Sequence, residues 1–265
     1  MKIIEKFTRS KTGNEKLNED SFLIGKDFVV VADGTTAKGK SFLGESDGRI
    51  VSRFVCECFK NISLSLDPIQ ILNQINLMLA NELESKNIKS DFSSCSLLVY
   101  NDVRKEVFSY GDCMYKIGSK EYAFVKNSDI ELAKIRSNVI KESLSNGATI
   151  DEIRNKDIGR QAIEESLKEN VKYANILGER GYPVINGKGI VEDYIDLIKV
   201  DKGSEIILST DGYPKLLSTL NKTEKLLARI IEKDPLCIDD YLSTKGVMNG
   251  NESFDDRTYI RLKVL

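Results

Sequence analysis

Acidic residues stand at the ends of predicted strands along this 265-residue chain, and histidine is absent from it. Asp33-Gly34 follow the apolar run Phe28–Ala32, and Asp211-Gly212 follow another apolar run. The other acidic sites placed in this way are Glu19-Asp20, Asp112 and Asp255-Asp256. Carboxylates at rigid strand ends can be held in the fixed positions that a metal site requires. Oxygen ligands suit Mg²⁺ or Mn²⁺ rather than zinc, and the Gly34 carbonyl is a further candidate ligand because glycine lets the backbone approach closely.

The absence of histidine excludes several kinds of catalytic and metal site. It excludes Ser-His-Asp and Cys-His mechanisms and every histidine-ligated zinc or iron site. A single Asp-Gly pair is more typical of a turn than of a ligand. Acidic residues beside five separate strands in one chain favour a shared metal site over coincidence.

The composition predicts a globular protein. The 39 Lys and Arg residues nearly balance the 41 Asp and Glu residues, so no strong field attracts nucleic acid or a membrane surface. No apolar run is long enough for a membrane span or a signal-peptide core. The five cysteines fit buried thiols in a reducing compartment better than a disulfide framework. We therefore expect a cytoplasmic protein with one domain over residues 1–265.

The hydrophobic periodicity predicts an α+β fold. Short connections between predicted strands force antiparallel pairing, and helices follow in two groups. The expected strands are Ser21–Gly25, Phe28–Ala32, Cys95–Tyr100, Glu106–Tyr110, Met114–Ile117, Tyr122–Val125, Tyr194–Val200, Glu205–Ser209 and Tyr259–Val264. The expected helices include 50–59, one that starts at Asp67-Pro68, Thr223–Lys233 and Leu236–Leu242. Residues 129–173 are rich in Lys, Glu and Asn with helical spacing, which predicts a helical flap insertion.

Two motifs compete for the segment after Ala32. Gly34–Ser41 matches the P-loop pattern G-x-x-x-x-G-K-S, which would bind nucleotide phosphates through Lys40 and Ser41. A P-loop needs a helix at its end and a parallel sheet, whereas glycines interrupt the next turns and the strands are joined by hairpin-length turns. The same segment is similar to the D-x-D-G-T motif of haloacid-dehalogenase-type phosphatases, but their nucleophilic aspartate is Val31 here.

Taken in order, the acidic motifs resemble those of the metal-dependent serine/threonine protein phosphatases of type 2C, the PPM family. The segments that carry the resemblance are Asn18-Glu19-Asp20-Ser21-Phe22, Val30-Val31-Ala32-Asp33-Gly34, Ser94-Cys95-Ser96, Gly111-Asp112-Cys113, Ser209-Thr210-Asp211-Gly212-Tyr213 and Phe254-Asp255-Asp256-Arg257-Thr258. They leave the 129–173 flap unmatched. Each motif is short, and their joint order gives the resemblance its weight.

The resemblance implies a four-layer αββα sandwich of two antiparallel sheets with two Mn²⁺ or Mg²⁺ ions between the sheets. It assigns catalytic roles to Asp33, Asp211 and Asp256. Asp33 would bridge both ions, Asp211 and Asp256 would complete one site, and the Gly34 carbonyl with Glu19 or Asp20 would complete the other. Asp112 matches the residue that holds a third, weaker ion in some members. A metal-activated water would attack phosphorus directly.

The implied function is the removal of phosphate from phosphoserine or phosphothreonine in a phosphoprotein substrate. Glu15 stands where the family has a phosphate-binding arginine, and Lys16, Arg9 or Lys11 are the candidate substitutes. Thr35 stands at the general-acid histidine of many members, and Lys215 replaces a frequent acidic residue. Glu15 motivates the alternative, a non-catalytic phosphatase-like binding or regulatory domain. The oligomeric state does not follow from the sequence.

Overall fold

The computed structural model describes residues 1–35, 45–88 and 93–265. Within them, ten strands form two five-stranded sheets in which every pairing is antiparallel. One sheet has the order β1-β10-β9-β6-β7 and the other β2-β3-β4-β5-β8. The strands are β1 (Lys2–Arg9), β2 (Asp20–Ile24), β3 (Phe28–Gly34), β4 (Cys95–Asn101), β5 (Glu106–Tyr110), β6 (Met114–Ile117), β7 (Lys120–Tyr122), β8 (Asp196–Lys199), β9 (Glu205–Ser209) and β10 (Arg257–Lys263).

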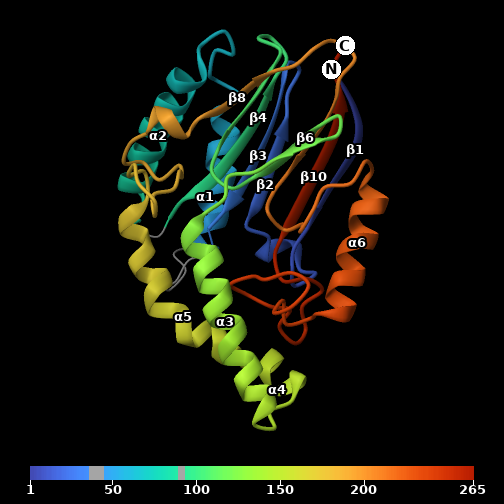
Figure 1. Cartoon of the computed structure of the whole chain (residues 1–265). Helices are drawn as coiled ribbons and strands as arrows, with labels where there is room; N and C mark the ends of the chain where they lie inside the picture. Colours follow the sequence, from blue (N-terminus) through green and yellow to red (C-terminus); the bar gives the residue numbers. More distant parts are fainter. Residues whose placement is uncertain (36–44, 89–92) are drawn as a thin grey trace.

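Helices cover the outer face of each sheet (Figure 1). The α-helices are α1 (Asp47–Cys58), α2 (Pro68–Ser85), α3 (Asn127–Ser145), α4 (Ile150–Asn155), α5 (Ile158–Glu169) and α6 (Leu220–Lys233). Short 3-10 turns lie at Glu15–Leu17, Asn170–Tyr173 and Glu192–Tyr194. Helices α1 and α2 lie on one side of the molecule and α6 on the other, so the predicted four-layer αββα sandwich is confirmed.

The strand β3 shows why the sandwich forms. Its apolar residues alternate between two cores, because successive side chains of a strand point to opposite faces. Val29 and Val31 join the core between the two sheets, whereas Val30 and Ala32 join the core under α1 and α2. A strand covered on both faces reads as one continuous apolar run, as Phe28–Ala32 does.

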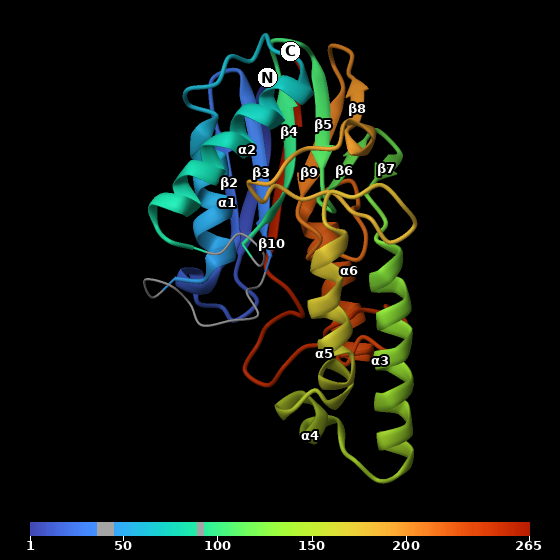
Figure 2. The ribbon, with the colours of Figure 1, turned by 90° about the vertical axis from the view of Figure 1, so that its left-hand side faces the viewer.

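The helices α3, α4 and α5 extend beyond one end of the sandwich in both views (Figures 1 and 2). We call α3–α5 the helical extension. It occupies most of the predicted 129–173 flap. Buried residues between α3 and α5 give this unit its own small core, with Leu132, Ile163 and Leu167. No helix in the described parts of the chain is long and apolar enough to span a membrane.

The structure differs from the sequence-based expectations in three local elements. The N-terminal strand β1 was not predicted, and the strand expected at Tyr122–Val125 ends at Tyr122. The helix expected at Leu236–Leu242 is a series of turns. There the Asp234 carboxylate accepts hydrogen bonds from the backbone N–H groups of Ile238, Asp239 and Asp240, which replaces the helical pattern.

Candidate metal centre

The acidic strand ends meet at the end of the sandwich from which the helical extension projects. A cavity of about 950 Å³ opens there, and its lining combines Asp33, Asp112, Asp211 and Asp255 with residues of the helical extension. Strand pairing sets part of this arrangement, because Asp20 on β2 is the register partner of Asp33 on β3. The sheets thus bring together carboxylates that lie more than two hundred residues apart in the chain.

Two glycines allow the strand ends to pack closely. A Cβ on Gly34 would lie 2.3 Å from the carbonyl oxygen of Gly48 and 2.6 Å from that of Glu19. A Cβ on Gly212 would lie 2.0 Å from the carbonyl oxygen of Asp256. Each glycine therefore holds a predicted ligand, Asp33 or Asp211, against a neighbouring backbone segment that any larger residue would displace.

Asp33 and Asp211 form the centre of the cluster. Both side chains line the same cavity, and the two carboxyl groups are near enough for the charge of Asp211 to act on Asp33. Burial, followed by the charge of Asp211 and then Asp20, raises the pKa of Asp33 well above its usual value. Burial, followed by the neighbouring carboxylates Asp255 and Asp112, raises the pKa of Asp211 to about 7. Carboxylates that destabilise one another in this way favour a bound cation or protons.

Asp20 connects the two sheets. Its Oδ2 accepts hydrogen bonds from the hydroxyls of Thr210 and Thr258, at 2.8 and 2.9 Å. Its Oδ1 is buried without a hydrogen-bond partner among the described residues, and the same holds for Oδ1 of Asp211. A buried acceptor without a partner is costly, and a cation would satisfy it.

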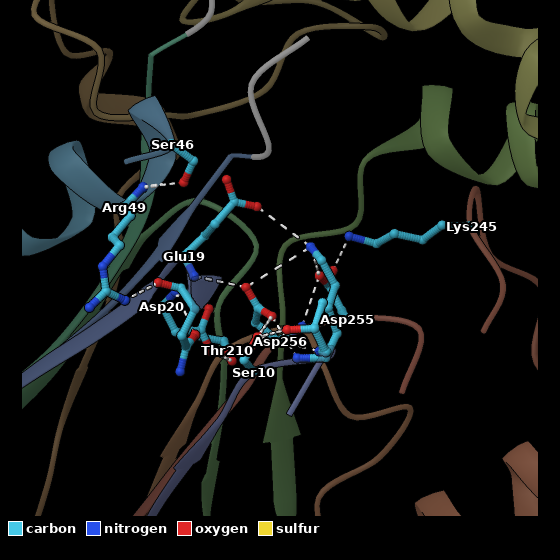
Figure 3. A network of polar contacts seen from close by, with 12 residues as sticks. Ser10, Glu19, Asp20, Ser46, Arg49, Thr210, Lys245, Asp255 and Asp256 are labelled. Atoms are coloured by element: carbon cyan, nitrogen blue, oxygen red, sulfur yellow. Dashed lines mark hydrogen bonds and ion pairs between the residues drawn. The ribbon is translucent and has the colours of Figure 1, made fainter. Parts of the chain in front are cut away.

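The neighbours Asp255 and Asp256 have different surroundings (Figure 3). Asp256 accepts backbone N–H groups with both oxygens, from Lys11 at 2.7 Å and from Glu19 at 2.8 Å. Asp255 instead faces the ammonium groups of Lys11 and Lys245. Burial would raise the pKa of Asp255, but these two ammonium groups hold it below its usual value. The resemblance implied Asp256 as the ligand, whereas it is Asp255 that lines the cavity together with Asp33 and Asp211.

The remaining predicted residues surround this centre. Asp112 accepts a hydrogen bond from the Ser96 hydroxyl, and Ser96 is the register partner of Asp33. The carbonyl of Glu19 accepts the Ser52 hydroxyl at 2.6 Å, which ties the Glu19 segment to α1. Lys40 and Ser41 of the P-loop match lie outside the described residues. The strand β3 pairs antiparallel with both of its neighbours, β2 and β4. A P-loop fold has a parallel sheet instead, so this arrangement argues against a P-loop.

The three departures from the family pattern also have defined positions. Glu15 is half-exposed, and its carboxylate accepts the Ser10 N–H and the Asn18 side-chain amide, each at 3.3 Å. Thr35 bonds to Ser94 through its hydroxyl, at 3.0 Å. Lys215 is exposed. None of these three side chains is a histidine-like proton donor or an arginine-like phosphate ligand.

The cluster combines an excess of negative charge with two cations of the protein itself. Among the described residues, the six carboxyl groups of this cluster lie near the ammonium groups of two lysines, Lys11 and Lys245; the carboxyl groups are those of Glu19, Asp20, Asp33, Asp211, Asp255 and Asp256. As the side chains stand, no three Asp, Glu or Cys groups in residues 1–35, 45–88 and 93–265 are arranged to hold a metal ion. The carboxylate oxygens of the cluster are the kind of ligand that Mg²⁺ and Mn²⁺ prefer. Their excess negative charge and the buried oxygens without hydrogen-bond partners among the described residues also fit a divalent cation.

Solved structures with this architecture are serine/threonine phosphatases. No protein-family model and no curated protein matches the sequence. The catalytic domain of the serine/threonine phosphatase PstP, solved with two manganese ions, is 15% identical with full coverage of both chains and a TM-score of 0.51. Mycobacterium tuberculosis PstP/Ppp is 14% identical over 99% of each chain, with a TM-score of 0.50. Stp1 from Staphylococcus aureus is 15% identical over 98% of this chain and 94% of its own, with a TM-score of 0.51.

These similarities establish the fold. The chain has the architecture of PPM-type serine/threonine phosphatases over its whole length, as the order of its acidic motifs predicted. At such low identity the individual site residues rest on the contacts described above.

Proposed function

We propose that this protein is a phosphatase that uses Mn²⁺ or Mg²⁺ to remove phosphate from phosphoserine or phosphothreonine in proteins. The observation that carries the proposal is the gathering of Asp33, Asp211 and Asp255 on the lining of one large cavity, within a phosphatase fold, with a buried Asp211 oxygen that has no hydrogen-bond partner among the described residues. Asp33, Asp211 and the Gly34 carbonyl would hold divalent metal, with Asp255, Asp20 and Glu19 beside them. Asp256, the ligand that the resemblance implied, would instead hold the backbone of Lys11 and Glu19 in place.

Divalent ions bound here would activate water and neutralise charge on the phosphoryl oxygens. The protein itself positions the carboxylates and supplies positive charge through two lysines. The fixed strand ends orient the carboxylates, and the ammonium groups of Lys11 and Lys245 place positive charge beside Asp255 on the cavity lining. The cavity continues from the carboxylates to the helical extension and offers space for the residues that flank a phosphorylated side chain. Asp112 would hold a third, weaker ion.

The function is tested by phosphate release from a phosphothreonine peptide with Mn²⁺, with EDTA, and in the Asp211→Asn variant. We expect turnover that requires the metal and is lost in the variant. Asp193→Asn is the matched control, because Asp193 is exposed outside the cluster. Metal-independent turnover, or full activity of Asp211→Asn, would refute the mechanism. A folded protein that binds Mn²⁺ but hydrolyses no phosphopeptide would be the non-catalytic binding domain.

The two neighbouring aspartates provide a second test. Asp255→Asn should lose Mn²⁺ affinity, since Asp255 faces the other carboxylates. Asp256→Asn should keep it but unfold more easily, because an amide can accept only one of the two backbone N–H groups without turning a donor toward the other. The free energy of unfolding should fall by about 1–3 kcal/mol in that variant. Equal loss of Mn²⁺ affinity in both variants would contradict this assignment.

A cytoplasmic location and a single catalytic domain belong to the same proposal. Their support is that all five cysteines are free and buried, as in a reducing compartment, and that the phosphatase fold extends over the whole chain.

A further inference from the structure

Lys245 places a positive charge inside the carboxylate cluster, and no sequence motif contains it. Its ammonium group contacts Oδ2 of Asp255, while the Lys11 ammonium lies 3.4 Å from Oδ1 of the same carboxylate. Both oxygens of Asp255 are thus occupied by cations of the protein. Lys245 is also attracted by the charges of Asp211 and Asp33. An ammonium group is a compact point charge with three donors, so it can neutralise several carboxylates at once.

The backbone around Lys245 is held firmly by the helical extension. Arg136 on α3 donates hydrogen bonds to the carbonyls of Leu236 and Ser243, at 2.8 and 3.1 Å. Arg160 on α5 donates to the carbonyl of Thr244 at 2.9 Å.

The residue after Lys245 is equally constrained. A Cβ on Gly246 would lie 2.7 Å from the Arg136 guanidinium and 2.8 Å from the Leu236 carbonyl oxygen. The residues on both sides of Lys245 are therefore fixed against α3 and α5. Its ammonium reaches the cluster from a preorganised loop, unlike a lysine on an open surface.

We propose that Lys245 is a built-in cation of the metal centre, which takes the place of one divalent ion beside Asp255 and Asp211. This inference rests on the proposed function, because it concerns the same carboxylates. It predicts that the wild-type chain holds one divalent ion tightly, whereas a chain without this ammonium holds two. It also assigns a role to the helical extension, which positions the loop that carries Lys245.

The test measures Mn²⁺ binding in the absence of substrate. Titration calorimetry gives the stoichiometry, and electron paramagnetic resonance separates an isolated Mn²⁺ from an exchange-coupled pair. We expect one tight ion and an isolated signal for the wild type. For Lys245→Met we expect a second ion, a coupled signal, and an affinity at the second position that is tighter by about tenfold or more. Without metal, this variant should melt at a lower temperature than the wild type, and Mn²⁺ should stabilise it more.

Two further variants keep the test decisive. Lys245→Gln removes the charge but keeps a polar end, so it should show the same second ion if Lys245→Met folds poorly. Lys141→Met is the matched control, because Lys141 pairs at 2.7 Å with the exposed Asp239 outside the cluster, and it should bind Mn²⁺ as the wild type does.

The same number of ions in the wild type and in both Lys245 variants would overturn the inference. If the wild type then holds two ions and releases phosphate, the proposed function stands and only the role of Lys245 is refuted. If no protein binds Mn²⁺ and none releases phosphate, both proposals fail.

Discussion

The ion pair between Arg136 and Asp157 allows a quantitative test of how the helical extension is held. Arg136 is fully buried and Asp157 is 9% exposed. The guanidinium donates two hydrogen bonds to Oδ2 of Asp157, at 3.0 and 2.7 Å, besides those to backbone carbonyls of the 236–243 segment. Arg136→Met keeps much of the apolar stem but leaves Asp157 as a buried charge without its partner, and leaves the carbonyls without their donor.

Removing one partner of a buried ion pair costs about 3–5 kcal/mol. The chain has 265 residues. At about 2.1 cal/mol/K per residue its unfolding entropy is about 0.6 kcal/mol/K, so Tm should fall by about 5–9 °C. Urea unfolding should show the loss as a lower midpoint with an unchanged slope.

The double variant Arg136→Met with Asp157→Asn identifies the cause. An asparagine can still accept the backbone N–H of Arg160, which Asp157 caps at 2.7 Å, but it carries no charge. If the uncompensated charge dominates the loss, the double variant should recover at least about 1 kcal/mol relative to Arg136→Met. A loss below about 1 kcal/mol in Arg136→Met, or no recovery in the double variant, would refute this reasoning.

Four further outcomes are expected. Gly212→Ala should destabilise the fold by about 1–3 kcal/mol and weaken Mn²⁺ binding, since its methyl group would overlap the Asp256 carbonyl; wild-type urea and calorimetric values would contradict this. Glu15→Gln should lower KM for a phosphopeptide by about two- to fivefold at low salt and less at high salt, because it removes a negative charge from the position that the family pattern gives to a phosphate-binding arginine. EDTA should lower Tm by about 5 °C relative to protein with Mn²⁺ at a hundredfold excess over Kd, which corresponds to about 2.7 kcal/mol. All five cysteines are buried, and burial raises the pKa of Cys58 to about 11, so a disulfide reagent should label none in the native protein and five in guanidinium chloride.

The layers of the fold follow closely from local sequence patterns. The continuous apolar run of β3 predicted a strand with both faces covered, and it lies between two cores. The short links at Asn101-Asp102 and Gly118-Ser119-Lys120 predicted antiparallel pairs, which β4–β5 and β6–β7 are.

Patterns failed where distant residues decide the local structure. The edge strand β1 has no regular apolar alternation, because the pairs Ile3-Ile4 and Glu5-Lys6 interrupt it, and its partner β10 lies at the other end of the chain. The apolar spacing of Leu236–Leu242 predicted a helix. In the structure, backbone N–H groups of this segment donate to the Asp234 carboxylate, and the Arg136 guanidinium donates to one of its carbonyls. Tertiary contacts therefore replaced the hydrogen bonds that a helix would have made.

The sequence by itself determined which chemistry is available. Without histidine and with acidic residues at the ends of strands, any metal here must be held by oxygen. Only the tertiary structure decided which of two adjacent aspartates faces the cluster. Asp255 lies in a bend and Asp256 directly precedes β10, so a one-residue difference separates Asp255, which faces Lys245, from Asp256, which binds backbone N–H groups. Lys245 itself reaches the cluster because α3 and α5, about a hundred residues earlier in the chain, hold its loop. A contact between segments so far apart in the chain cannot be predicted from the local sequence pattern.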